Sequence, residues 1–242
     1  MNHLQLVPLT ITVDAGTCIS VQLDARDVNG MQVANPGPTL SWELRPPAGV
    51  QTFNNPACTI SPGAYLTSPL VQTGYLWADK FGQSSVYPTI VTPPTGYAQG
   101  RSVQVSSVAK LSGFPASLPY NVCTPVTLTA SALALDNTDL NLTSSGTFTF
   151  NSGGCVGTLS AVTIYSLSNS ATGYVRSNTG GMVQISTFTN VLRFNPLAVT
   201  LTRPDAGTPC LGDGDACSTS TSCCSDVCLF SACKGVPLPT GP

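Results

Sequence analysis

Charged residues are scarce in this chain of 242 residues, at 8% where about a quarter is usual. There are 9 lysines and arginines and 11 aspartates and glutamates, which gives a net charge of -2 at pH 7. So few basic residues offer no positive patch to nucleic acid or to an anionic membrane. We therefore expect no nucleic acid among the partners, no membrane insertion, and a surface built mainly from hydroxyl and amide groups.

Histidine and the common catalytic motifs are also nearly missing. The single histidine is His3, so neither a Ser-His-Asp triad nor a histidine-rich metal site can be assembled reliably. No phosphate-binding glycine loop and no HExxH motif is present. The pairs Asp24 with Asp27 and Asp213 with Asp215 could hold calcium, but isolated acidic turns are usually only turns. We predict a non-enzyme without cofactor or metal.

Cysteine, in contrast, is abundant, and six of the 10 cysteines fall within residues 210–233. Successive cysteines there are separated by six, five, zero, three and four residues. The segment is too short and too polar to build a hydrophobic core, and it has no C-x-x-C pair or nearby histidine for zinc. These features predict disulfides, although the spacing alone leaves the pairing open.

The order of these six cysteines, with a vicinal pair in the middle, resembles the inhibitor cystine knot of knottin peptides. In that family the first cysteine pairs with the fourth, the second with the fifth and the third with the sixth. The resemblance therefore implies the bridges Cys210–Cys224, Cys217–Cys228 and Cys223–Cys233.

Disulfides require an oxidising compartment, yet no secretory signal is visible at the N-terminus. Residues 4–13 are mostly apolar but lack a basic flank, and they predict a first strand instead. No apolar run approaches the ~18 residues of a membrane span. Either a signal has been removed, or the protein leaves the cell by another route. Met1 and the missing signal favour release with a phage particle.

Alternating apolar residues predict strands in the first part of the chain. Residues 19–25 alternate at period two, and the stretch ends in Asn29-Gly30, a tight-turn signal. Residues 40–44 alternate again. The pattern Val-x-Leu-x-Ala-x-Asp-x-Asn-Gly-x-x-Val at residues 21–33, followed by Leu40-x-Trp42, resembles bacterial immunoglobulin-like domains of invasin-like and intimin-like adhesins and of phage surface proteins. This resemblance implies a β-sandwich and carries over no catalytic site.

The same pattern returns in the second part of the chain. A cysteine opens a strand at Cys18 and again at Cys123, and a second cysteine follows the next strands at Cys58 and again at Cys155. This recurrence indicates a diverged tandem repeat. It also predicts the bridges Cys18–Cys58 and Cys123–Cys155, because each cysteine otherwise lacks a local partner.

The predicted fold is all-β, with two tandem immunoglobulin-like sandwiches and a small C-terminal cystine knot. The predicted boundaries are a first sandwich at 1–94, a linker at 95–100, a second sandwich at 101–203, a linker at 204–209, the knot at 210–235 and a proline-rich tail at 236–242.

Three functions fit this organisation. The first is a structural or adhesive component outside the cell, on a virion or a bacterial surface, oligomeric within an assembly of neighbouring structural proteins. In the second, the knot is an inhibitor-like or toxin-like ligand with Leu229 and Phe230 as its contact. In the third, an aromatic platform binds glycans, although aromatic residues in strands are usually core. Its candidates are Tyr65, Tyr75, Trp77, Phe81 and Tyr87, with Tyr75 and Trp77 as the favoured partner contacts.

Overall fold

Strands dominate the computed structural model, and the predicted all-β fold is confirmed. One 3-10 turn at Ser220–Ser222 is the only helical element among the described residues. The described part of the chain has no helix with the length and apolar character of a membrane span.

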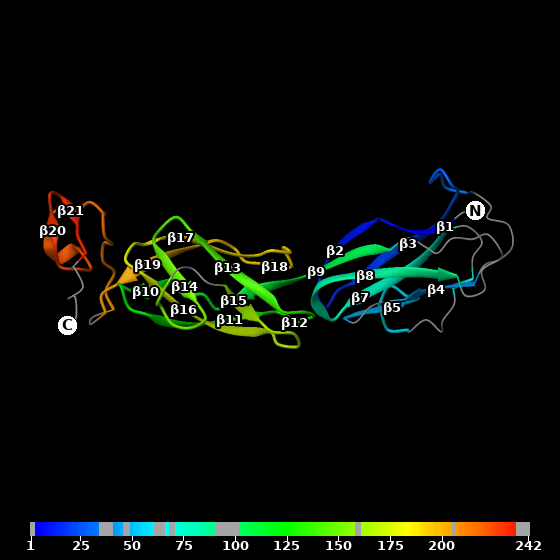
Figure 1. Ribbon diagram of the computed structural model, residues 1–242, viewed down its shortest axis with the longest axis horizontal. Coiled ribbons are helices and arrows are strands. Elements are labelled where there is room, and N and C mark those ends of the chain that lie inside the picture. The colour runs from blue at the N-terminus through cyan, green and yellow to red at the C-terminus, as the bar shows by residue number, and fades with distance from the viewer. Residues whose placement is uncertain are drawn as a thin grey trace. The chain divides into compact units, whose positions relative to one another are not determined.

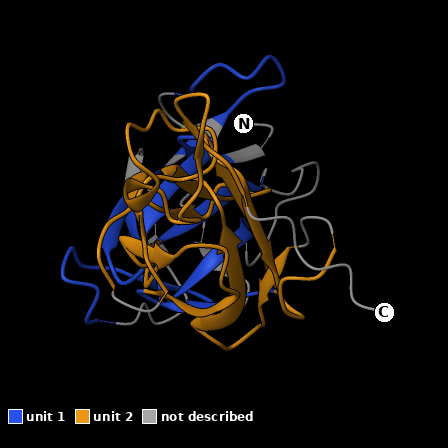
Figure 2. Ribbon diagram, turned by 90° about the vertical axis from the view of Figure 1, so that its left-hand side faces the viewer, with its two compact units in different colours: residues 1–109, 131–136 blue, residues 110–130, 137–242 orange. Residues whose placement is uncertain are grey.

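The chain divides into two compact units, coloured separately in Figure 2: unit 1 is Met1–Ala109 with Ser131–Asp136, and unit 2 is Lys110–Ala130 with Asn137–Pro242. The structure describes residues 3–33, 41–45, 49–60, 66–67, 71–90, 102–157, 161–204 and 207–235.

Unit 1 consists of two sheets (Figure 1). The first is antiparallel and has the order β1 (His3–Val7), β3 (Cys18–Arg26), β7 (Val71–Ala78) and β5 (Val50–Phe53). The second has the order β2 (Thr10–Asp14), β9 (Val103–Ser112), β8 (Lys80–Ile90), β4 (Ser41–Arg45) and β6 (Leu66–Thr67). Only β2 runs parallel to its neighbour within these described strands. The predicted first strand is thus two strands in different sheets, interrupted at Pro8, which has no backbone N–H to donate.

A short segment from later in the sequence completes unit 1. Strand β12 (Leu133–Ala134) pairs in parallel with β8, and the Leu135 N–H donates to the Phe81 carbonyl at 2.8 Å. Ala134 and Phe81 are both fully buried. Gly82 has a φ of +150°, and a Cβ there would lie 2.8 Å from the Leu135 side chain. Unit 1 therefore depends on residues that the sequence places 20 or more positions beyond its last strand.

Unit 2 repeats the two-sheet arrangement of unit 1. One sheet contains the end of β9, then β11 (Thr124–Ala130), β16 (Ser170–Ser177) and β14 (Phe148–Asn151). The other has the order β10 (Ser117–Pro119), β19 (Leu197–Thr202), β17 (Gly181–Thr187), β13 (Thr138–Ser144) and β15 (Val162–Ile164), with β10 parallel to β19. The remaining strands are β18 (Leu192–Arg193), β20 (Cys228–Leu229) and β21 (Ala232–Cys233).

The strand orders of the two units correspond one to one. β1-β3-β7-β5 matches β9-β11-β16-β14, and β2-β9-β8-β4-β6 matches β10-β19-β17-β13-β15. These are the A-B-E-D sheet and the sheet containing C, F and G of immunoglobulin-like sandwiches. Each unit also has one disulfide at the same place, from the start of the second strand of the first sheet to the segment after the fourth.

Strand β9 divides the chain at a different place from the predicted linker. Its residues from Val103 pair with β2 and β8 inside unit 1, whereas Leu111 and Ser112 pair with β11 inside unit 2. Unit 2 therefore begins at Lys110, nine residues after the predicted start at 101. The predicted linker 95–100 and tail 236–242 lie outside the described residues.

Gly173 tests the packing between the two sheets of unit 2. A Cβ on Gly173 would lie 2.7 Å from the Phe150 ring and 2.8 Å from a methyl of Val162, both of which are buried core side chains. We expect Gly173→Ala to lower the free energy of unfolding by about 1–3 kcal/mol, because the core would be overpacked. Urea unfolding with the disulfides intact measures this.

Gly153→Ala is the matched control, because a Cβ there would meet nothing within 4 Å. It should change the free energy of unfolding by less than about 0.5 kcal/mol. Equal effects of the two substitutions would show that the inferred packing around Gly173 is wrong.

Candidate functional site

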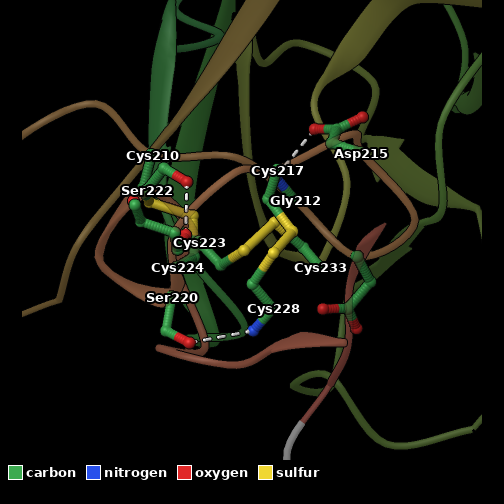
Figure 3. The surroundings of a disulfide bond; sticks show 12 residues. Cys210, Gly212, Asp215, Cys217, Ser220, Ser222, Cys223, Cys224, Cys228 and Cys233 are labelled. Carbon is green, nitrogen blue, oxygen red and sulfur yellow. Dashed lines mark hydrogen bonds between the residues drawn. A yellow bond between two sulfur atoms is a disulfide. The ribbon is translucent and has the colours of Figure 1, made fainter. Parts of the chain in front are cut away.

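Sulfur atoms form the core of the segment 210–233, which we call the cysteine-rich module (Figure 3). Cys223 and Cys233 are fully buried, Cys217 is nearly so, and their three sulfurs lie within 4.8 Å of one another. All three are in disulfides, so they offer no thiolate to a metal. Among the described residues, Leu211 and Cys228 pack against this cluster as partly buried apolar residues.

The module contains three bridges, Cys210–Cys224, Cys217–Cys228 and Cys223–Cys233. The connectivity is therefore first to fourth, second to fifth and third to sixth. Two of the bridges end on the hairpin of β20 and β21, in which Cys228 pairs with Cys233. The hairpin is thus tied to the rest of the module through both of its strands.

Asp213 holds the module against the sheets of unit 2. One carboxylate oxygen accepts a hydrogen bond from the Tyr120 hydroxyl at 2.7 Å, and the other accepts one from the Asn178 side-chain amide at 3.1 Å. The backbone N–H of Asp213 donates to the Asn178 carbonyl at 2.8 Å. Gly212 fits closely here, since a Cβ would lie 2.8 Å from both the Asn178 carbonyl oxygen and the Thr179 Cα.

Arg203, which directly follows β19, makes the second set of contacts with the module. Its guanidinium donates to an Asp226 carboxylate oxygen at 2.6 Å, to the Cys223 carbonyl at 2.9 Å and to the Thr221 carbonyl. The Arg203 N–H donates to the Thr208 carbonyl at 2.8 Å. Gly207 in turn donates its N–H to the Arg203 carbonyl at 2.9 Å, so the described residues 207 and 208 lie close to Arg203.

The most exposed apolar residues of the module are at the tip of its hairpin. Leu229 is 52% exposed and Phe230 is 98% exposed. Phe230 and Ser231 have φ values of 53° and 61°, which places both central residues of the two-residue turn in the left-handed region. A bulky residue seldom adopts this conformation, which favours asparagine and glycine.

The structure separates the predicted aromatic platform into different places. Tyr75 and Trp77 lie on one face of β7, both half-buried, while Phe81 is fully buried and cannot contact a ligand. Tyr87 is 50% exposed but lies on β8 in the other sheet. Tyr65 lies outside the described residues.

Phe53, which the sequence analysis missed, completes a three-residue aromatic group with Tyr75 and Trp77. Its cross-strand partner is Tyr75, and Trp77 pairs with Gln51 and with Cys18 of the Cys18–Cys58 bridge. The half-buried state of all three rings favours local packing over an open sugar platform.

The acidic pairs considered for calcium are engaged in local contacts. Asp24 accepts from Arg26 at 2.8 Å, and an Asp27 carboxylate oxygen accepts from the N–H groups of Asn29 and Met31. Asp215 accepts from the Gly212 N–H at 2.8 Å, and Asp213 has the partners described above. These carboxylates stabilise turns and the docked module.

Tyr120, Asn178 and Arg203 were not identified as functional residues from the sequence. Tyr120 and Asp213 are 93 residues apart, so no local pattern connects them. Apart from the scarcity of charged residues, no feature of the sequence distinguishes Arg203.

No protein-family model matches the chain, and no curated protein is significantly similar to it in sequence. Among solved structures, the adhesin InvE of Yersinia pseudotuberculosis is 13% identical with a TM-score of 0.41, over 90% of this chain and 64% of that one. InvD of the same organism is 12% identical with a TM-score of 0.30, over 89% and 64% of the two chains. Domains 5–6 of the S-layer protein SbsC are 10% identical with a TM-score of 0.27, over 80% and 94%.

The matches to InvE and InvD span less than two thirds of the length of those chains, 64% in each case. A TM-score below about 0.5 does not establish a shared topology. The fold is therefore assigned from the strand orders given above.

Tyr120 gives a pH-dependent test of how the module is held. Burial first, and then the hydrogen bond to Asp213 and the charge of that carboxylate, raise the pKa of Tyr120 well above its usual range. The contribution to stability is complete below the ordinary tyrosine pKa of about 10 and is lost as the pH rises toward the raised value. We therefore expect Tyr120→Phe to be less stable than the wild type at pH 8, with a difference that shrinks above about pH 10.

Urea midpoints measured from pH 8 to about pH 11 check this, in the range where the unfolded tyrosine begins to ionise. Tyr165→Phe, which removes a phenol that is 66% exposed, should have no effect at either end of the range. A Tyr120→Phe difference that grows with pH would contradict the described contact with Asp213.

Proposed function

We propose that the chain is a non-enzymatic structural and adhesive component on the exterior of an extracellular assembly. The observation that carries this proposal is that all ten cysteines are paired in disulfides. Such a chain folds stably only where thiols are oxidised, outside the cytosol. A phage virion is the first location to test, and a bacterial cell surface is the second.

The organisation of unit 2 supports an adhesive role. The module is held by hydrogen bonds from Tyr120 to Asp213 and from Arg203 to Asp226, and it presents Leu229 and Phe230 to the solvent. The first-to-fourth, second-to-fifth and third-to-sixth connectivity supports a cystine knot. Its partners in this proposal are neighbouring structural proteins of the particle or appendage, and a receptor or glycan on the host surface.

Fractionation of the source culture tests the location. Cytosol, envelope, supernatant and density-purified particles are alkylated before lysis and analysed by mass spectrometry. We expect the protein in the particle or envelope fraction, with every cysteine in a disulfide. A protein found mainly in the cytosol with alkylated cysteines would sink the proposal.

A second candidate function makes the module itself the ligand, as in inhibitor-like knottins. The specific observation in its favour is Phe230, which is 98% exposed in a strained turn. Backbone strain at an exposed apolar residue is more often maintained for function than for stability. In this function the sandwich units serve as a stalk and the Leu229–Phe230 tip enters a pocket of another protein.

Phe230→Asn separates binding from stability, because asparagine suits the left-handed turn better than phenylalanine does. We expect the variant to melt no lower than the wild type and to lose at least roughly tenfold in affinity, as for a binding hot spot. The assay is binding of the purified chain to the particle or envelope fraction identified above.

Phe188→Asn is the matched control, because Phe188 is 95% exposed but lies outside the module. It should bind as the wild type does. Equal loss in both variants would indicate non-specific apolar adhesion, and no loss in Phe230→Asn would remove the module from the contact.

A further inference from the structure

A hollow of about 110 Å³ lies in unit 2 beside the paired strands β14 and β16. Thr149 and Arg176 are direct cross-strand partners in these strands, and both are half-buried. We call this hollow the Arg176 pocket. Its lining consists of Asn121, Thr147, Thr149, Arg176, Ser177 and Asn178.

The side chain of Arg176 makes no hydrogen bond or ion pair with another residue in the described ranges. The contrast with two other arginines is clear: Arg26 pairs with Asp24, and Arg203 pairs with Asp226. An arginine side chain without a carboxylate partner keeps five N–H donors available.

The other lining residues divide into fixed and available groups. The Ser177 hydroxyl is placed between the Thr147 and Thr179 carbonyls at 2.5 and 2.6 Å, and the Asn178 amide donates to Asp213. The Ser177 hydroxyl is therefore engaged, whereas the buried side-chain oxygen of Asn178 has no hydrogen-bond partner in the described chain. The side chains of Asn121, Thr147 and Thr149, however, make no hydrogen bond with the rest of the described chain.

In unit 1, the position that corresponds to Arg176 is occupied by Trp77. There Trp77 is the cross-strand partner of both Cys18 and Gln51. In unit 2, the last pair of the β11–β16 ladder is Thr124 with Val175. Cys123 and Arg176 are the next residues of the two chain segments and so lie at the corresponding place. One unit thus has an aromatic ring beside its disulfide strand, and the other has an unpaired cation among hydroxyls and amides.

We propose that the Arg176 pocket binds the carboxylate of an acidic sugar residue, such as a uronate of a surface polysaccharide. A guanidinium binds a carboxylate through two parallel hydrogen bonds. The free hydroxyls of Thr147 and Thr149 and the amide of Asn121 match the hydroxyl groups of a sugar ring. No lining residue is aromatic, so a neutral sugar would gain no stacking there.

An acidic peptide fits the pocket less well, because its side chain would use the guanidinium and leave the hydroxyl and amide groups unused. The site is distinct in its residues from the Leu229–Phe230 tip. Its biological meaning rests on the proposed adhesive role, but a solution titration of the purified chain can fail or succeed independently of the fractionation experiment.

The test is a titration of the isotopically labelled full chain, followed by backbone amide shifts in NMR spectra. The probes are sodium glucuronate, glucose and N-acetylglutamate. We expect glucuronate to shift the amides around residues 121, 147–149 and 176–178, with a Kd on the order of 1 mM. Glucose and N-acetylglutamate should bind at least roughly tenfold more weakly, because glucose lacks the carboxylate and N-acetylglutamate lacks the sugar hydroxyl groups.

Arg176→Gln should abolish the glucuronate shifts, and Thr149→Val should weaken them about threefold to tenfold. Lys234→Gln removes the same charge elsewhere in unit 2 and should bind as the wild type does. Unchanged amide shifts away from the pocket establish that the variants are folded.

Three results would overturn the proposal. Glucuronate binding that survives in Arg176→Gln would place the site elsewhere. Equal binding of N-acetylglutamate would make it a general carboxylate site for peptides instead of sugars. The absence of any shift at tens of millimolar glucuronate, on the order of ten times the expected Kd, would show that the pocket takes no acidic sugar.

Discussion

The three disulfides of the cysteine-rich module take the place of a hydrophobic core, and the shape of the module depends on them. Each bridge that closes a loop of 10–14 residues restricts the unfolded chain by roughly 3 kcal/mol. The left-handed turn at Phe230 and Ser231 costs about 1–2 kcal/mol per residue. The stabilisation from the three disulfides therefore exceeds the cost of the left-handed turn. The module can thus keep Phe230 at a position that favours glycine or asparagine. An apolar core of comparable size is not available within so short and polar a segment.

A repeated scaffold has diverged in the residues beside its disulfides. Both units have the same strand orders, and each has a bridge from the second strand of one sheet to the segment after the fourth. At equivalent positions unit 1 has Trp77 and unit 2 has Arg176. The tryptophan is one of three half-buried rings, whereas the arginine lines a hollow without a partner of its own in the described structure. The strand pairing thus fixes the position, and the two units differ in the side chain placed there.

The sequence predicted individual strands of unit 1 and little of the site. Period-two alternation correctly placed β3 and β4, because alternation reflects one buried face of a strand whatever its neighbours are. It could not say which sheet a strand joins, and so β9 was assigned wholly to the second domain. Phe81 follows Trp77 by an even number of residues, yet it lies in the other sheet and is buried, since the chain changes sheets between β7 and β8. The contact between Tyr120 and Asp213 spans 93 residues and has no local signature at all.

The way in which the module is held bears on what its tip can do. A flexibly linked module would have to lose its freedom of orientation when it meets a partner, and that loss weakens binding. Here Asp213 accepts hydrogen bonds from Tyr120 and Asn178, and Arg203 donates hydrogen bonds to Asp226 and Cys223, so the module is fixed to the sheets of unit 2. The hairpin is further tied to the module through Cys228 and Cys233. Phe230 is therefore oriented before any contact forms, so its apolar surface can contribute to affinity with little further ordering of the chain.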